Sequence, residues 1–261
     1  MLDDCVPYRR LGGLAHTLQL LIKEAFDGTY KDVLVKARSL VGKVRKSSVA
    51  MEKIVLKCGK IVRSDNTTRW NSSYLMAQRL QELKMDLNML LPGLKMDSLL
   101  TSEWDQLEEL VALLEPFRTQ TDILQSDALS LSNVIPSLLE LECHLEQFPE
   151  QFPSSRKVTE VMKLKLRTRF AVLLEPDQED VEFNPLPAAA CLLDPSCASV
   201  ILGFDQTALR DRAKSYLEFD CSLLNKGAVV LFTAEYPPVP VIEEPKAPAS
   251  FGVATSYCSQ V

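Results

Sequence analysis

Histidine is almost absent from this sequence, since only His16 and His144 occur among 261 residues. Structural zinc sites take their four ligands from Cys and His, so such a site is poorly supplied here. None of the seven cysteines forms a C-x-x-C pair. Cys143 and His144 are neighbours, but adjacent helical residues point about 100° apart and do not easily share a metal ion. The same shortage leaves little material for a Ser-His or Cys-His nucleophile. We expect no metal and no cofactor.

Other features that the sequence lacks exclude further classes of protein. No P-loop, G-x-G-x-x-G, H-E-x-x-H or G-x-S-x-G motif occurs. No apolar run is long enough to span a membrane, and residues 1–13 lack the basic and apolar regions of a signal peptide. We therefore expect reduced thiols in a reducing compartment and no membrane partner. The net charge of -6 argues against a uniformly basic nucleic-acid binder but leaves local patches open.

What the sequence does contain is helical periodicity. Apolar spacing predicts helices over 14–26, from just after Trp70 to Leu91, and over 101–125, 130–148, 154–174 and 207–224. A long helical region covers 30–62, with a bend or break expected at Gly42 or at the Ser47–Ser48 pair. Pro149 and Pro153 are expected to close the helix that begins at Ser130. Residues 234–261 contain five prolines without periodicity, which predicts disorder.

Charge is distributed in blocks along the chain. Residues 31–63 contain ten basic residues against Asp32 and Glu52, and residues 154–174 contain six against Glu160. Between these blocks, residues 97–150 contain twelve acidic residues and one basic residue, Arg118. Two interpretations are open. The blocks are either solvated helix faces of unlike charge, or two basic surfaces that flank an acidic one.

Residues 65–76, DNTTRWNSSYLM, stand at the start of a predicted helix. On one interpretation Trp70 anchors the core, and Asn71 or Ser72 caps the N-terminus of the helix. On the other, Arg69 and Trp70 form an edge that holds phosphate and stacks on an unpaired base.

The string TRWNSSYLMAQRLQEL, residues 68–83, resembles a segment of hAT-family transposases and of the BED zinc-finger proteins domesticated from them. That segment reads T-R-W-[NS]-S-x-Y-x-M-L-x-R-L. Three further pieces are similar to family segments in the right order. They are residues 5–25, which match C-x-x-H-x-L-N-L with Gln19 in place of Asn; residues 101–145, which match W-x-x-L-x-x-L-x-x-L-L-x-P-F; and residues 190–202, which match A-x-x-L-D-P-R-[FY]-K with Ser196 in place of Arg and no Lys.

The resemblance implies a mainly α fold. Transposases of this family have an RNase H-like core interrupted by a large helical insertion domain. We expect residues 1–29 to be a remnant of that α/β core, 30–187 the helical insertion domain, 188–224 a second core remnant with the LDP motif, and 225–261 a Pro-rich, disordered tail.

The resemblance also implies a chemistry. The family cuts DNA with an Asp-Asp-Glu set that holds divalent metal ions. Its two Asp residues belong to strands that precede the segment starting at Cys5, so we expect both to be missing. The third residue falls in the region of Glu218, without a certain alignment. We therefore expect no enzyme activity, and we expect the family's dimerisation region to be missing too.

These observations lead to a first hypothesis of a catalytically inactive, hAT-transposase-derived nuclear protein that binds DNA. Arg69 and Trp70 are the predicted DNA contacts by the family match, and Lys43, Arg45 and Lys46 are predicted to contact phosphate. The alternative is a helical protein-interaction scaffold without a nucleic-acid role, whose acidic 97–150 helices meet basic partners.

Overall fold

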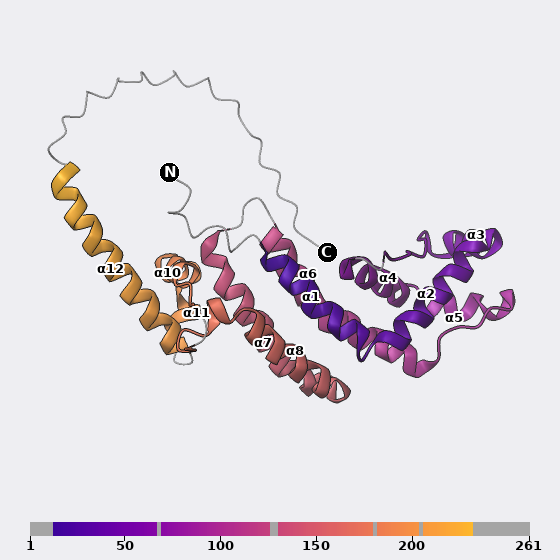
Figure 1. Cartoon of the computed structure of the whole chain (residues 1–261). Helices are drawn as coiled ribbons and strands as arrows, with labels where there is room; N and C mark the ends of the chain where they lie inside the picture. Colours follow the sequence, from indigo (N-terminus) through magenta and orange to yellow (C-terminus); the bar gives the residue numbers. More distant parts are fainter. Residues whose placement is uncertain (1–12, 67–68, 126–129, 180–181, 204–205, 232–261) are drawn as a thin grey trace, which may run out of the picture. The chain divides into compact units, whose positions relative to one another are not determined.

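A computed structural model describes residues 13–66, 69–125, 130–179, 182–203 and 206–231, with side chains up to Phe219. Within these ranges every regular element is a helix and no strand occurs (Figure 1). The mainly α fold predicted from the sequence is therefore confirmed. The predicted disorder of residues 234–261 and the Cys5 end of the N-terminal segment lie outside the described residues.

The α-helices are α1 (Leu14–Asp27), α2 (Lys31–Lys46), α3 (Ser48–Cys58), α4 (Trp70–Glu82), α5 (Lys84–Leu90), α6 (Thr101–Gln125), α7 (Val134–Gln151), α8 (Arg156–Arg169), α9 (Ala171–Leu174), α10 (Leu186–Leu193), α11 (Ala198–Leu202) and α12 (Thr207–Leu231). Short 3-10 turns follow or precede them at η2 (Pro92–Leu94), η3 (Leu131–Asn133) and η4 (Pro153–Ser155).

The break predicted within residues 30–62 occurs at Ser47 and not at Gly42. Ser47 has extended backbone angles of φ -102° and ψ 107°, and its Oγ accepts a hydrogen bond from the Ala50 N–H at 3.2 Å. That bond satisfies one of the free amides at the start of α3. Gly42 lies inside α2, which continues through it.

Several predicted helix limits were wrong. The helix expected over 154–174 is split at Phe170 into α8 and α9, and the one expected from Ser130 begins at Val134. The helix expected to run to Leu91 is split at Leu83 into α4 and α5.

Pro149 and Pro153 were expected to close α7; Pro149 lies inside that helix, whereas Pro153 stands two residues after its end at Gln151. The buried side chain of Phe148 stacks on Phe152, with ring centroids 4.8 Å apart and planes 19° apart. This packing stabilises the last turn of α7. The stabilisation outweighs the loss of the backbone hydrogen bond that Pro149 cannot donate.

One hydrophobic core joins side chains from Leu14 in α1 to Ala213 in α12. Helix α1 packs against α6 and α8, α4 packs against α6, and α7 packs against α8 (Figure 1). The contacts divide the chain into residues 1–219 and 220–261, and the core belongs to the first unit. The domain limits at residues 30, 188 and 225 rest on the family resemblance and stay predictions.

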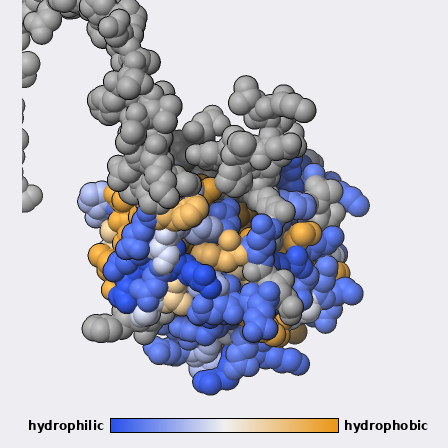
Figure 2. All heavy atoms as spheres, turned by 60° about the vertical axis from the view of Figure 1, so that its left-hand side comes forward, coloured by the Kyte–Doolittle hydropathy of each residue, from blue (hydrophilic) through white to orange (hydrophobic). Residues whose placement is uncertain are grey.

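The face drawn in Figure 2 is mostly hydrophilic, and hydrophobic side chains appear in small groups between the charged ones. No described helix combines the length and apolar character needed to cross a membrane.

Candidate nucleic-acid interface

Helix α2 positions most of the predicted basic residues. Its apolar side chains Val33, Leu34, Ala37, Leu40, Val41 and Val44 are buried, which turns the remaining faces outward. Lys31, Arg38 and Arg45 are spaced by seven residues, about two helical turns, so they follow one another along a single face. Lys36 and Lys43 have the same spacing on another face. The sequence pattern of α2 thus creates two parallel rows of cations.

Ion pairs neutralise three of the ten basic residues in 31–63. Lys36 pairs with Glu103, Arg38 Nε lies 2.7 Å from Asp65 Oδ2, and Lys60 Nζ lies 2.9 Å from Glu82 Oε2. The other seven form no ion pair with a described residue, and we call them the basic surface: Lys31, Lys43, Arg45, Lys46, Lys53, Lys57 and Arg63. Helices α2 and α3 and the segment after them therefore keep an excess of positive charge.

The second basic block behaves differently, because most of α8 is paired. Lys163 pairs with Glu146 of α7, and Arg167 pairs with the buried Glu142 and with Glu175. Lys165 and Arg169 both pair with Glu24 of α1. Arg167 therefore has a raised pKa and Glu24 a lowered pKa, each chiefly through the hydrogen bond to its partner. Much of the acidic block is used inside the molecule, so the two basic blocks are not equivalent surfaces.

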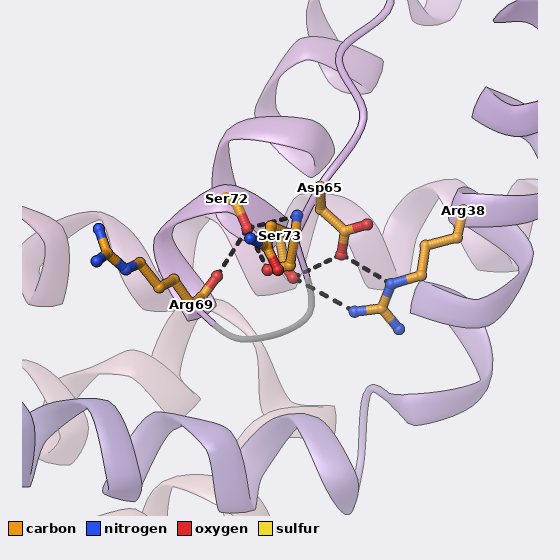
Figure 3. Close-up of polar contacts among 6 residues, drawn as sticks. Arg38, Asp65, Arg69, Ser72 and Ser73 are labelled. Atoms are coloured by element: carbon orange, nitrogen blue, oxygen red, sulfur yellow. Dashed lines mark hydrogen bonds and ion pairs between the residues drawn. The ribbon is translucent and has the colours of Figure 1, made fainter.

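Arg69 and Trp70, which we call the Arg-Trp segment, stand at the start of α4. Trp70 is the first residue of the helix, is only 6% exposed, and meets the Tyr74 ring edge-on at a centroid distance of 6.2 Å. Its role as a core anchor, one of the two interpretations from the sequence, agrees with this burial. Arg69 is the N-cap residue, with extended angles of φ -130° and ψ 119°, and its exposed side chain points away from Arg38 and Asp65 (Figure 3).

The prediction that Asn71 or Ser72 caps this helix was wrong. Both lie within the first turn of α4 and bind elsewhere. Asn71 Oδ1 accepts from Arg118 of α6 at 2.9 Å. Ser72 Oγ accepts from the Asn66 N–H at 2.8 Å and lies 2.6 Å from the Asn66 carbonyl oxygen (Figure 3). The serine therefore ties the preceding segment to the helix, because the helix starts three residues earlier than a cap at Ser72 requires.

A polar cluster joins α2 to the start of α4. Asp65 Oδ2 accepts from Arg38 Nε at 2.7 Å and from Ser73 Oγ at 2.8 Å (Figure 3). The Asp65 side chain is 8% exposed, whereas that of Arg38 is 31% exposed. Arg38 is thus held in one orientation while its side chain stays partly exposed.

Arg38 separates two clefts beside α2. The Trp70 cleft has a volume of about 320 Å³, and its lining includes Gln19, Lys23, Lys31, Arg38 and Trp70. The Gly42 cleft has a volume of about 370 Å³, and its lining includes Arg38, Gly42, Arg45, Lys46, Asp65 and Met76. Both volumes lie in the range typical of small-ligand sites. Each cleft combines cations at its rim with apolar side chains.

The structure brings together only some of the predicted contacts. Arg45 and Lys46 share the Gly42 cleft, and Trp70 lines the neighbouring one. Lys43 lies on the other row, in a cleft of about 250 Å³ beside residues 97–100. Sequence reasoning missed Lys23, Arg38 and Gly42 as lining residues. The seven-residue spacing could have indicated Arg38, but Lys23 comes from α1 and no local pattern links it to α2.

The reactive side chains His144 and Cys191 are held within the fold. The pKa of His144 is lowered by burial, and its ring lies between Phe117 and Phe148 with Nε2 3.0 Å from the Leu113 carbonyl oxygen. Burial raises the pKa of the Cys191 thiol to about 12. Among the residues with described side chains, no three His, Cys, Asp or Glu residues gather as metal ligands. Glu218 is exposed on α12.

The chain is similar to a known family and to a known human protein. Residues 12–113 match the family model described as the ZBED1 RNase-like helical domain. The human "Zinc finger BED domain-containing protein 4" is 24% identical over 191 residues, which cover 69% of this chain and 16% of that protein. The chain thus spans about a sixth of the length of this relative. No solved structure matches it.

Proposed function

Because this chain is related to the BED zinc-finger proteins that derive from hAT transposases, we propose that it is a nuclear DNA-binding protein without catalytic activity. DNA meets the basic surface of α2 and α3, with Arg69 at one edge and the Trp70 cleft beside it. The observation that carries this proposal is the basic surface, whose cations keep no acidic partner among the described residues, whereas four of the six cations of α8 are paired.

The arrangement suits phosphate binding. Side chains seven residues apart on a helix are separated by about 10 Å along its axis, so Lys31, Arg38 and Arg45 can each meet a different phosphate of one strand. Such contacts hold the backbone without reading the sequence of bases. Arg38 adds a planar donor fork that Asp65 has already oriented.

Arg69 and Trp70 have different roles in this proposal. Arg69 is exposed and sits at the N-terminus of α4, where free backbone amides also favour an anion. Trp70 is too covered to offer a full ring face to a base, and its part is to line the cleft and to fix the start of α4.

We propose that the chain does not cleave DNA, and this rests on how its acidic residues are used. Glu103 and Glu142 are buried and paired with Lys36 and Arg167. Glu109 is buried against the hydroxyls of Tyr30 and Ser154. Carboxylates held in this way support the fold and are not free to bind catalytic metal ions. A nicking assay with Mg²⁺ or Mn²⁺ that gave cleaved product would overturn this part.

DNA binding is tested with two matched double variants. We expect R45Q/K46Q to weaken binding to a labelled DNA at low salt by roughly tenfold and to reduce the salt slope of log K by about 1.5, because two phosphate contacts are lost. The control R156Q/K157Q removes the same charge from exposed α8 residues that form no ion pair with a described residue, and it should leave the affinity within about twofold. Fluorescence anisotropy measures both.

Arg69→Ala extends this test to the Arg-Trp segment. It should weaken binding by a smaller factor, since one cation is lost and the side chain makes no cap hydrogen bond that folding requires. A wild-type protein that binds no DNA at low salt, where phosphate contacts are strongest, would reject the proposed function.

The alternative is a protein-interaction scaffold, and one observation favours it. Leu56 on α3 is 78% exposed, and Met85 and Met89 on the neighbouring α5 are 77% and 62% exposed. Lys57 Nζ lies 3.0 Å from Met89 Sδ, so the two helices are in contact there, and Met85 and Met89 are four residues apart on one face of α5. Exposed apolar groups of this kind occur at protein interfaces. Binding to a partner through them would depend weakly on salt, in contrast to the steep dependence of DNA binding.

A further inference from the structure

Gly42 is an unexpected residue for the middle of α2. Apart from proline, glycine is the least favourable residue in a helix interior. Nothing nearby demands it, because no atom of a neighbouring element lies within 4 Å of the position that a Cβ would take. The backbone at Gly42 is helical, so a side chain could be accommodated there. The missing side chain therefore has one structural effect, which is to leave the Gly42 cleft open.

The position of Gly42 gives this opening its chemical character. Arg38, Gly42 and Arg45 occupy one face of α2, four and three residues apart, so the gap lies between two guanidinium groups. Arg45 donates to Ser64 Oγ and has no acidic partner among the described residues, and Lys46 borders the same cleft. Val41 and Met76 supply an apolar floor. The cleft has cations at its rim, hydroxyl and carboxylate groups on its wall, and an apolar base.

We propose that the Gly42 cleft holds one unpaired nucleotide of single-stranded DNA, with the two flanking phosphates on Arg45 and Lys46. This rests on the proposed DNA binding and specifies its ligand. A base needs an exposed face and edge to enter a cleft of about 370 Å³, and in a duplex both are covered by stacking and pairing. Single-stranded DNA offers them together with its phosphates, which is the combination that such sites recognise.

The charge distribution supports one nucleotide at this place. Asp65 neutralises Arg38 from one side and leaves Arg45 and Lys46 as uncompensated cations at the cleft. Two cations match the two phosphates that flank a nucleotide. Without a Cβ, the α2 backbone at Gly42 lets a flat ring approach closely, which a larger residue would prevent.

Filling the cleft tests the proposal without changing any charge. Gly42→Leu places an isobutyl group in the open space, keeps every cation, and replaces glycine by a better helix former. We expect its affinity for a short single strand to fall about tenfold, because the base is excluded from the cleft, and its affinity for the matching duplex to stay within about twofold. Gly42→Ala adds only a Cβ, so it should weaken single-strand binding by a smaller factor than Gly42→Leu and leave duplex binding within about twofold.

Several outcomes separate this inference from the proposed function. If the wild type binds neither DNA at low salt, the proposed DNA binding itself fails. If the wild type binds DNA but Gly42→Leu binds the single strand as tightly as before, or loses the duplex to the same extent, the inference about the cleft alone is overturned.

A second measurement needs no variant and so does not depend on how Gly42→Leu folds. A single strand that contains 5-iodouracil should crosslink under light to the peptide that spans residues 38–46 of the wild-type protein. Crosslinks confined to α8 would contradict the proposed place of the base.

Discussion

At the scale of single residues, Asp194 shows how a motif residue can acquire a partner that its sequence surroundings do not indicate. Its Oδ1 accepts from the Ser196 N–H at 3.0 Å and from Ser196 Oγ at 2.7 Å. Its Oδ2 accepts at 2.7 Å from Oγ of Ser132, which is 62 residues earlier in the chain. Ser196 occupies the position where the family pattern has Arg. These bonds, those of Ser196 first, lower the pKa of Asp194 from the ordinary 3.8 to about 2.

The pH dependence of stability follows from this shift. A carboxyl group whose pKa is lower in the folded state stabilises the fold above its unfolded pKa, and this contribution is lost as pH falls toward the folded pKa. The wild type should therefore lose stability between about pH 4 and pH 2 through Asp194. Asp194→Asn should be less stable than the wild type at pH 5 and should lose less on acidification. Urea unfolding at a series of pH values measures this, and parallel pH profiles for the two proteins would contradict it.

At the scale of elements, helix ends depend on which side chains reach the free amides. Ser47 caps α3 with its own Oγ, and the pair Ser47–Ser48 was a visible signal in the sequence. At α6, Thr101 is the first helical residue and Leu100 precedes it. There Glu103 reaches back to the Leu100 N–H at 2.9 Å, which is one half of a capping box. Glu103 also pairs with Lys36, so this helix end is joined to α2.

Ser47→Ala tests the cap of α3. It should lower the free energy of unfolding by about 1 kcal/mol, because the Ala50 N–H loses its acceptor at the helix start. Ser48→Ala is the control, since Ser48 is exposed at the first helical position, where alanine is well tolerated. Urea denaturation of both variants gives the comparison. Equal losses in the two variants would show that the cap contributes nothing specific.

At the scale of the whole molecule, the fold decides which charged side chains find a partner of opposite sign. Glu24 of α1 meets Lys165 and Arg169 of α8, more than 140 residues later, and so joins the two ends of the core. The acidic residues of α7 take up other cations of α8. Helices α2 and α3 lack enough acidic neighbours, so their excess charge remains at the surface. An acidic protein thus carries a local basic surface.

Glu24→Gln tests this long-range contact. It leaves Lys165 and Arg169 without their shared partner, and we expect a loss of about 1 kcal/mol or less, because Glu24 is 37% exposed and solvent screens the pair. Glu146→Gln removes an ion pair with a single cation, Lys163, and should cost less. Urea unfolding at low and high salt should show the difference between the variants shrinking as salt rises. A difference that grows with salt would argue against the electrostatic origin.

The sequence by itself determined the helical elements, a break at Gly42 or at the Ser47–Ser48 pair, and the resemblance to hAT-derived proteins. These rest on local spacing, capping side chains and short motifs, which need no knowledge of distant residues. The N-cap predicted at Asn71 or Ser72 failed because Arg118 and Asn66 bind those side chains instead.

Only the tertiary structure decided which cations are free, how far Trp70 is buried, and that Gly42 opens a cleft. Each depends on residues far apart in the chain, such as Glu24 beside Arg169 or Arg38 beside Asp65. A charge run has the same appearance in sequence whether or not an acid from another helix lies against it. Packing of the helices makes that choice, and with it decides which surface stays basic.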